Sequence, residues 1–375
     1  MKTVGVNLLM MIPDQGGGPE VYARRMVQGL ADCPDLRLKL FVNLEAAQSF
    51  EPSERVEIVV VEFAPERFRT RLAAEQKKLP RLARKYGVDV LFNPLGSAPR
   101  RTRCPQVVTI HDLSHERFGE RLGFWALRKR RRLIKRSLRG ADRLIAVSEY
   151  TAEDLRRFCK VEPPPIEVIA HGVDTQLAQL EPGLLERVRE RYSLPESFAF
   201  LPGRTLWHKN HVGAVRAIAR LREDWDAELP LVLCGGEGEG HADMLEQIEI
   251  DGVKKLVRHL GRVEDSEIPA LYSMATCLLF PSRIEGFGLP LLEAFACGCP
   301  VICSNTCGLP RTAGDAALLV DPDHVEGMAH ALRLVMSEPE LRASLIERGK
   351  ARASQMTWYR TVEQTAQLLR AMAGD

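Results

Sequence analysis

Residues 281–300, PSRIEGFGLPLLEAFACGCP, constrain the fold of this chain more than any other segment. They join a glycine-bearing turn to the start of a helix. Pro290 suits a first helical turn, where a backbone N–H has no partner within the helix, and Gly298 is typical of a helix end. A helix start presents free N–H groups and the positive end of the helix dipole. The segment therefore predicts a turn and a helix that can bind an anion such as phosphate.

Two carboxylates, Glu285 and Glu293, flank this helix start. Glu293 lies about two helical turns beyond Glu285, so both can face one bound ligand. Gly286 and Gly288 allow that ligand to approach the backbone closely. Because carboxylates accept hydrogen bonds from paired hydroxyls, the pattern favours a sugar nucleotide. The alternative is an ordinary amphipathic helix after a glycine turn, with both glutamates in solvent.

The length and composition describe a globular protein rather than a membrane-spanning or nucleic-acid-binding one. A chain of 375 residues predicts two domains. Its 45% hydrophobic and 27% charged residues are typical of a soluble protein. The net charge of +2 gives no reason to expect nucleic acid. No apolar run approaches the roughly 18 residues that span a bilayer, and residues 4–11 predict a buried first strand rather than a signal peptide.

The cysteines predict reduced thiols and no metal site. The chain has nine cysteines, an odd number that cannot pair completely in disulfides. This favours reduced thiols in a cytosolic protein. Cys297, Cys299, Cys303 and Cys307 are close in sequence, but their spacing matches no common zinc pattern. We therefore expect them at packing positions.

Glu285 and Glu293, with the intervening GFGLPLL, resemble the paired-glutamate motif of retaining glycosyltransferases of the GT-B fold, in family four. Residues 294–322 are similar to that family almost residue for residue, and the resemblance covers most of the chain. It implies an α/β fold of two Rossmann-like domains that face a central cleft, with a C-terminal helix returning to the first domain. The expected domains are residues 1–173 with 357–375, which would bind the acceptor, and residues 174–356, which would bind a nucleotide-sugar donor.

The resemblance also assigns the donor site. Arg204 and Lys209 follow a strand-like run, and an arginine and a lysine at such a turn can hold a diphosphate, although surface loops often carry such pairs. The family match favours the diphosphate role, and it places Arg262 and Val263 beside the nucleotide base. Arg311 stands where the family has a glutamate, so no contact is assigned to it. The further donor contacts that the resemblance implies are Gly286, Phe287, Gly288, Leu289 and Glu293.

In the N-terminal half the resemblance selects Gly17, Gly18 and His111. The two glycines belong to a loop after the first strand and would face the cleft. His111 ends the strand-like residues 105–110 and would bind the donor sugar; from the residues alone it is equally a partly buried histidine beside a capping Asp112. Ser148 predicts a helix N-cap.

Residues 121–139 contain nine basic residues and no acidic one, with Phe124 and Trp125 among them. Three explanations fit a basic amphipathic helix. It can be a solvated outer face with its arginines extended along apolar surface, a contact to an anionic membrane or lipid-linked acceptor, or a nucleic-acid surface. We expect no nucleic-acid partner, and we leave the first two open.

The sequence therefore predicts a cytoplasmic enzyme, peripheral at the inner face of the cell membrane if the basic helix contacts lipid. It would move a hexose from a nucleotide-diphosphate sugar to a glycan or lipid-linked acceptor in cell-surface polysaccharide biosynthesis. The resemblance implies retention of configuration, no metal or cofactor, and the catalytic residues His111, Arg204, Lys209 and Glu285.

The donor is the least constrained part of this prediction. Residues 75–80 contain a Glu75-Gln76 pair similar to that of mannosyltransferase-like members, which favours GDP-mannose, followed by UDP-sugars. Two alternatives on the same fold are a nucleotide-sugar epimerase and a non-catalytic membrane-surface or glycan-binding protein. The intact glutamate pair and the intact Arg204 and Lys209 argue against a binding protein that has lost its activity.

Overall fold

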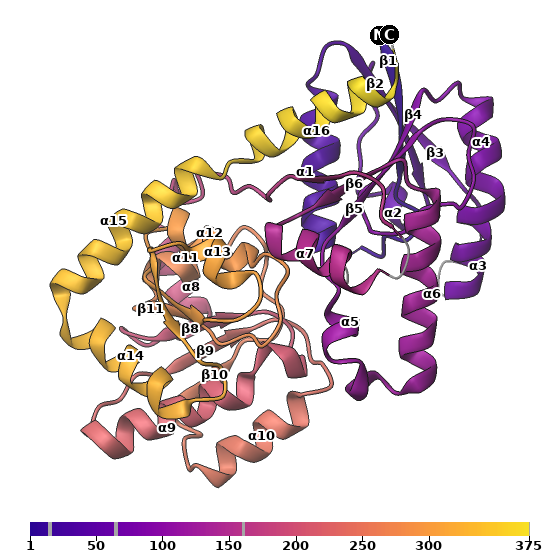
Figure 1. Cartoon of the computed structure of the whole chain (residues 1–375). Coiled ribbons are helices and arrows are strands. Elements are labelled where there is room, and N and C mark those ends of the chain that lie inside the picture. The colour runs from indigo at the N-terminus through magenta and orange to yellow at the C-terminus, as the bar shows by residue number, and fades with distance from the viewer. Residues whose placement is uncertain (14–16, 64–66, 160–161, 375) are drawn as a thin grey trace. The chain divides into compact units, whose positions relative to one another are not determined.

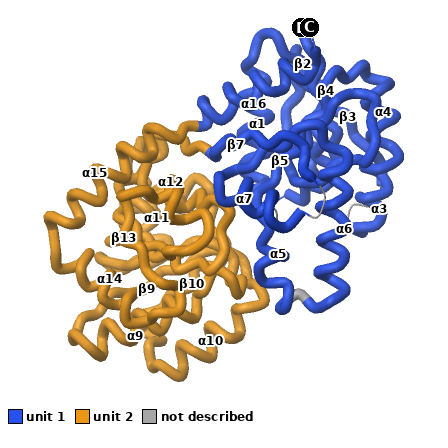
Figure 2. Tube along the Cα trace, in the orientation of Figure 1, with its two compact units in different colours: residues 1–171, 358–375 blue, residues 172–357 orange. Residues whose placement is uncertain are grey.

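The structure is a computed structural model that describes residues 1–13, 17–63, 67–159 and 162–374 (Figure 1). The chain divides into two compact units, residues 1–171 with 358–375 and residues 172–357 (Figure 2). Each unit is an α/β domain with its own sheet. The roles expected for them, acceptor binding and donor binding, stay predictions.

In its described residues, the first unit contains a parallel sheet of seven strands in the order β3-β2-β1-β4-β5-β6-β7. Parallel strands are covered by helices on both faces, which is why they read as continuous apolar runs. The strands are β1 (Lys2–Asn7), β2 (Leu36–Val42), β3 (Val56–Val60), β4 (Val90–Asn93), β5 (Gln106–Ile110), β6 (Arg143–Ala146) and β7 (Ile166–Val168). The helices are α1 (Gly18–Ala31), α2 (Leu44–Ala47), α3 (Phe68–Ala73), the π-helical turn η1 (Ala74–Lys78), α4 (Leu79–Lys85), α5 (Ser114–Arg117), the 3-10 turn η2 (Gly119–Leu122), α6 (Phe124–Gly140), α7 (Glu149–Phe158) and α16 (Trp358–Met372).

The last helix, α16, packs on the first unit, as the sequence predicted (Figure 2). Val362 of α16 lies against Gly29 of α1, where an added Cβ would come within 2.4 Å of Val362 Cγ2. Thr361 donates a hydrogen bond to the Ala170 carbonyl at 2.8 Å. The chain end is thus fixed by an apolar face and by a bond to the last residues of the first segment.

The second unit, residues 172–357, contains a parallel sheet of six strands in the order β10-β9-β8-β11-β12-β13, and all of its residues are described. The strands are β8 (Ala199–Pro202), β9 (Leu231–Cys234), β10 (Val257–His259), β11 (Cys277–Phe280), β12 (Val301–Ser304) and β13 (Ala317–Val320). The helices are α8 (Leu184–Arg191), the 3-10 turn η3 (Trp207–Lys209), α9 (His211–Trp225), α10 (His241–Ile250), α11 (Ile268–Met274), α12 (Leu289–Ala296), α13 (Leu309–Ala313), α14 (Val325–Ser337) and α15 (Pro339–Gln355).

Each sheet contains a point where the order of strands reverses. In the first unit it lies between β1 and β4, and in the second between β8 and β11. Loops leaving two such strands diverge to opposite sides, so a crevice forms at their carboxyl ends, where open α/β sheets bind ligands. These two places are therefore where the fold itself directs the search for a site.

Three elements differ from the sequence prediction at their ends. The first strand stops at Asn7 rather than continuing to Met11, because Met11 N–H turns back to the Leu8 carbonyl. Residues 257–263 of the sequence are strand-like throughout, but β10 ends at His259. The basic helix α6 starts at Phe124, because Gly123 has a positive φ of 68° and separates it from η2.

Candidate functional site

Beside the reversal point of the second sheet, the loops after β8, β9 and β10 contact one another through their backbones. Gly203 N–H donates to the Cys234 carbonyl at 2.8 Å, and Gly235 N–H donates to the Gly261 carbonyl at 2.7 Å. Gly235 has a φ of 127°, and an added Cβ would lie 2.5 Å from the carbonyl carbon of Gly203. Glycine is therefore required for the loops after β8, β9 and β10 to meet this closely.

Lys209 and Glu285 form an ion pair across the same point. The Nζ of Lys209 lies 2.6 Å from the Oε1 of Glu285, and the two side chains are only 17% and 16% exposed. Lys209 follows β8 in η3, whereas Glu285 follows β11. Lys209 Nζ also lies 4.9 Å from the ring centroid of Phe280. The pair fixes one cation and one carboxylate between the two strands where the chain order reverses.

The segment that leads into α13 holds the turn that carries Glu285 in place. Gly308 N–H donates to the Glu285 carbonyl at 3.0 Å, and the Thr312 hydroxyl donates to the Phe287 carbonyl at 2.6 Å. A Cβ on Gly308 would lie 2.3 Å from the Gly286 carbonyl oxygen. Backbone and hydroxyl contacts thus hold the turn in place, and the sequence analysis did not predict that Gly308 and Thr312 would support it.

Helix α12 begins at Leu289 because Gly288 has a φ of 93°, a conformation that residues with a Cβ avoid. Gly288 stands at the N-cap position and has no side chain with which to cap the helix. The positive end of the helix dipole at this start can therefore serve a bound anion. The four donor contacts predicted at residues 286–289 thus lie on one turn beside the Lys209–Glu285 pair.

Glu293 is on α12 and is oriented by a tyrosine that sequence reasoning missed. The Tyr272 hydroxyl donates to Glu293 Oε2 at 2.8 Å. Burial and the neighbouring Glu293 raise the pKa of Tyr272 well above its ordinary value, so the phenol stays protonated and keeps donating. Cys234 lies near the same carboxylate, and burial raises the pKa of its thiol to about 12. Glu293 is therefore oriented by α11, the helix that carries Tyr272.

The remaining predicted donor residues lie on loops of this unit. The exposed Arg204 follows β8, and its Nη2 donates to the Glu237 carbonyl at 3.2 Å. Arg262 is exposed and Val263 is buried, and both follow Gly261, which accepts the bond from the β9 loop. The structure therefore brings Lys209 and Glu285 together and places Arg204, Arg262 and Val263 on adjacent loops. The roles of all these residues stay predictions.

A buried histidine next to Lys209 was also missed. His211 opens α9 and is 3% exposed. Burial, with the charge of Lys209 next, lowers its pKa to about 3, so the ring is neutral at any ordinary pH. The sequence signal was present, since His211 lies two residues after the predicted Lys209.

His111, Gly17 and Gly18 belong to the first unit. His111 follows β5, and its Nε2 lies 2.7 Å from the Pro94 carbonyl oxygen. The ring stacks on His171 with centroids 5.4 Å apart. Burial lowers the pKa of His111, so Nε2–H donates to Pro94 while Nδ1 keeps a lone pair. Gly17 is the N-cap of α1 with a φ of 56°, and Gly18 is the first residue of that helix.

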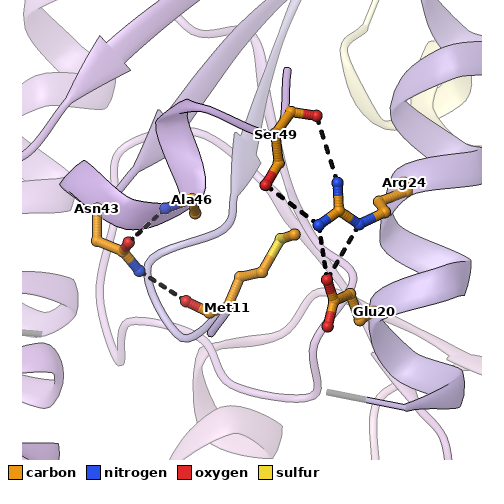
Figure 3. A network of polar contacts seen from close by, with 6 residues as sticks. All are labelled: Met11, Glu20, Arg24, Asn43, Ala46 and Ser49. Carbon is orange, nitrogen blue, oxygen red and sulfur yellow. Dashed lines mark hydrogen bonds and ion pairs between the residues drawn. The ribbon is translucent and has the colours of Figure 1, made fainter. Parts of the chain in front are cut away.

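The connection from β1 to α1 is anchored on both sides (Figure 3). Asn43 Nδ2 donates to the Met11 carbonyl at 2.7 Å. On the other side, Arg24 Nη2 donates to Glu20 Oε1 at 2.7 Å and to the Ser49 hydroxyl at 3.1 Å. These bonds fix the two flanks of the predicted glycine loop, of which residues 14–16 lie outside the described residues.

The reversal point of the first sheet holds a buried polar network that the sequence did not predict. Glu75, on the π-helical turn, accepts from Asn7 Nδ2 at 3.0 Å and from the Ser97 hydroxyl at 2.8 Å. Asn7 also donates to Asn93 Oδ1 at 2.9 Å. Glu75 is fully buried, and burial raises the pKa of its carboxyl. Asparagines at the ends of two apolar runs were the available signal, but their meeting depends on the strand order.

Four observations on the described residues concern metal binding, membrane spans, the cysteine thiols and the Ser148 cap. Among them, no group of three or more His, Cys, Asp or Glu side chains could hold a metal ion. No helix that the structure describes is both long enough and apolar enough to cross a membrane. All nine cysteines are free thiols. Ser148 caps α7 as predicted, since its hydroxyl accepts from Thr151 N–H at 3.1 Å.

The fold defines the class of protein first. The structure is similar to sucrose-phosphate synthase from Thermosynechococcus elongatus, with a TM-score of 0.80, 21% identity, and coverage of 99% of both chains. It is also similar to HepE from Anabaena in complex with UDP and glucose, with a TM-score of 0.75, 19% identity, and coverage of 99% of this chain and 100% of that chain. The two parallel-sheet units thus form the GT-B fold of glycosyltransferases.

Sequence comparison then gives the family. The family described as "Glycosyltransferase Family 4" matches residues 16–177, and "Glycosyl transferases group 1" matches residues 186–352. O-antigen chain mannosyltransferase B of Escherichia coli is 30% identical over 261 residues, which are 69% of this chain and 68% of that protein. The chain belongs to this family of glycosyltransferases.

For two further relatives, the match to this chain covers a smaller part of the relative's own length. The MMP alpha-(1->4)-mannosyltransferase of Mycolicibacterium hassiacum is 33% identical over 235 residues, 62% of this chain and 54% of that protein. The D-inositol 3-phosphate glycosyltransferase of Salinispora arenicola is 35% identical over 240 residues, 59% of this chain and 53% of that protein. The match therefore spans about half the length of these two relatives.

Proposed function

We propose that this enzyme transfers a hexose, with mannose favoured, from a nucleotide-diphosphate sugar to a glycan or lipid-linked acceptor in cell-surface polysaccharide synthesis. The observation that carries the proposal is the Lys209–Glu285 pair, 2.6 Å apart, beside the uncapped start of α12. A cation, a carboxylate and the positive end of a helix dipole meet there, as a sugar diphosphate requires. Two relatives described as mannosyltransferases support mannose.

In this proposal each part of the donor has its own partner. Glu293, oriented by the Tyr272 hydroxyl at 2.8 Å, accepts hydrogen bonds from the ribose hydroxyls. Lys209, Arg204 and the N–H groups of the turn before α12 hold the diphosphate. The base lies by Arg262 and Val263. GDP is the first choice of nucleotide and UDP the second; the HepE structure, which contains UDP and glucose, supports a nucleotide-sugar donor without selecting the base.

The transfer that we propose retains the configuration of the anomeric carbon. The bond from that carbon to the terminal phosphate oxygen breaks, and the acceptor oxygen forms its bond on the same face. The acceptor's proton passes to the departing phosphate oxygen. Lys209 and Arg204 stabilise the negative charge that develops there, so no metal is needed. Glu285 and the neutral His111 position the sugar.

A thermal-shift screen of GDP, UDP, ADP, dTDP and their common sugars, without added metal, tests this proposal. A ligand that binds only the folded state raises the melting temperature. We expect a shift with one base that Glu293→Ala abolishes, and then transfer to an added acceptor. Sugar conversion without an acceptor would indicate an epimerase instead, and no shift with any nucleotide would favour a non-catalytic binding protein.

A further inference from the structure

The N-terminal half of α6 carries two large aromatic side chains in solvent. Phe124 is 67% exposed and Trp125 is 76% exposed. Their rings touch edge to face, with centroids 5.2 Å apart. The buried residues of the helix, Ser137 and Leu138, lie near its other end. An exposed aromatic pair at a helix start is unusual for a helix face whose only contact is water.

An apolar groove of about 590 Å³ lies beside these aromatics, between α5, α6 and the end of α7. In Figure 1, α5 and α6 lie next to each other, and their residues are in contact. The apolar lining of the groove is formed by Leu113, Phe124, Leu127, Ile134, Leu138, Phe158 and Cys159. Burial raises the pKa of the Cys159 thiol to about 11, so this part of the lining is uncharged near neutral pH.

The same groove is lined by cations that have no carboxylate partner. Its one acidic lining residue, Glu116, is already paired with Arg131 at 2.7 Å. The other basic lining residues on α6 are Arg128, Arg132 and Lys135. Within the described residues, none of these three forms an ion pair. Their charge is therefore available to an anion from outside the molecule.

Charge complementarity and shape select one occupant. Three cations around an apolar hollow match a molecule with an anionic head and a hydrocarbon chain. A solvated helix face would explain the extended arginine stems, but it would not explain the exposed aromatic pair beside an apolar groove. Basic residues next to anionic head groups, with aromatic residues at the boundary of the acyl chains, are the features of a helix that lies in a membrane interface.

We propose that α6 docks the first unit on an anionic phospholipid surface. Arg128, Arg132 and Lys135 bind the head groups, Phe124 and Trp125 enter the interface, and one acyl chain occupies the groove. The proposal is independent of the transfer reaction, because it uses none of the residues assigned to the donor or to the sugar. It gives the enzyme a fixed place on a membrane, where a lipid-linked acceptor would be met.

Vesicle co-sedimentation of the full chain tests the docking. The vesicles are pure phosphatidylcholine, or phosphatidylcholine with about one third phosphatidylglycerol. We expect binding to the anionic vesicles only. Each cation near such a surface contributes roughly fivefold to the partition constant, so Arg128→Gln/Arg132→Gln/Lys135→Gln should lower it on the order of 100-fold. The matched control, Lys77→Gln/Arg81→Gln/Arg84→Gln, changes three exposed cations elsewhere in the same unit and should leave it unchanged.

Two further measurements separate this docking from general attraction between charges. Vesicles with brominated acyl chains should quench the fluorescence of the wild-type chain, and Trp125→Phe should remove most of that quenching. A double-stranded oligonucleotide serves as a competing anion without acyl chains. Equal loss of binding in the two triple variants, absence of acyl-chain quenching, or preference for the oligonucleotide over the vesicles would each overturn the proposal. Donor-induced thermal shifts should be the same in all variants, which keeps this test separate from that of the proposed function.

Discussion

The two sheets reverse their strand order in the same way, but they place different chemistry at that point. In the first unit the ends of β1 and β4 are closed by Asn7, Asn93 and the fully buried Glu75. In the second unit the ends of β8 and β11 carry a partly exposed ion pair, Lys209–Glu285. The first arrangement satisfies its polar groups internally, whereas the second leaves charge where a ligand can reach it. Topology therefore defines where a site can form, and the local side chains decide whether it stays open.

The largest effect is expected where the second unit depends on backbone contact. Gly308→Val would place a Cβ 2.3 Å from the Gly286 carbonyl oxygen and displace the turn that carries Glu285. Because a small displacement of a catalytic group strongly lowers the rate of reaction, the rate of transfer should fall by about 100-fold or more. Initial rates measure this, and melting temperature gives the stability. Gly236→Ala, where the nearest atoms would be 3.8 Å away, is the stability control and should melt as the wild type does.

The next prediction contrasts the two units directly. Glu75→Ala removes one acceptor of Asn7 Nδ2 and the acceptor of the Ser97 hydroxyl, both buried, and should lower the free energy of unfolding by about 3 kcal/mol. Glu285→Ala, in the more exposed pair, should lower it by about 1 kcal/mol or less while removing transfer activity. Denaturant titration with matched activity assays measures both. Equal destabilisation by the two variants would remove the distinction between a closed and an open reversal point.

Acid should destabilise the protein through its buried histidines. His211 has its pKa lowered to about 3 by burial, from an ordinary value of 6.5. Above about pH 6.5 the ring is mostly neutral in both the folded and the unfolded chain. As the pH falls from 6.5 toward 3, only the unfolded chain takes up the proton, so the free energy of unfolding decreases. Between pH 6.5 and 5 this amounts to about 2 kcal/mol. The free energies of unfolding of the wild type and of His211→Gln should change with pH at different rates over this range. Equal changes with pH would contradict the lowered pKa of His211.

The smallest effect concerns donor binding. Tyr272→Phe removes the 2.8 Å hydrogen bond to Glu293 but keeps the ring. A bond to a carboxylate contributes about 1 to 2 kcal/mol, so nucleotide affinity should weaken roughly tenfold. Calorimetry with the nucleotide found in the thermal-shift screen measures it. Unchanged affinity would show that Glu293 does not need Tyr272 for its orientation.

Local features of the site could be predicted from the sequence. The glycine turn, Pro290 and the helix that follows depend on backbone preferences of neighbouring residues, and α12 forms where they indicate, at Leu289–Ala296. The Ser148 cap and the helix near residues 121–139 have the same local origin. The GT-B fold and the family were also predicted, from the resemblance of the motif that contains Glu285 and Glu293.

Features that depend on tertiary structure could not be predicted. The meeting of Asn7 with Glu75 and Asn93 requires the strand order β1-β4, which no local pattern contains. The support that Gly308 gives to the Glu285 turn depends on two loops that approach through their backbones. Likewise, the basic segment was visible in the sequence, but the groove beside it was not, because α5 and α7 supply part of its lining.

The central claim is that Lys209 acts on the departing diphosphate. The most direct test compares the single-turnover rate of Lys209→Met with its donor dissociation constant. Lys254→Met is the matched control, because Lys254 pairs with Glu249 at 2.7 Å on the exposed surface of the same unit. We predict that Lys209→Met lowers the single-turnover rate of the donor-saturated enzyme by about 100-fold or more and weakens donor binding by only about tenfold. A variant that loses donor affinity but transfers at the wild-type rate once saturated would contradict the claim.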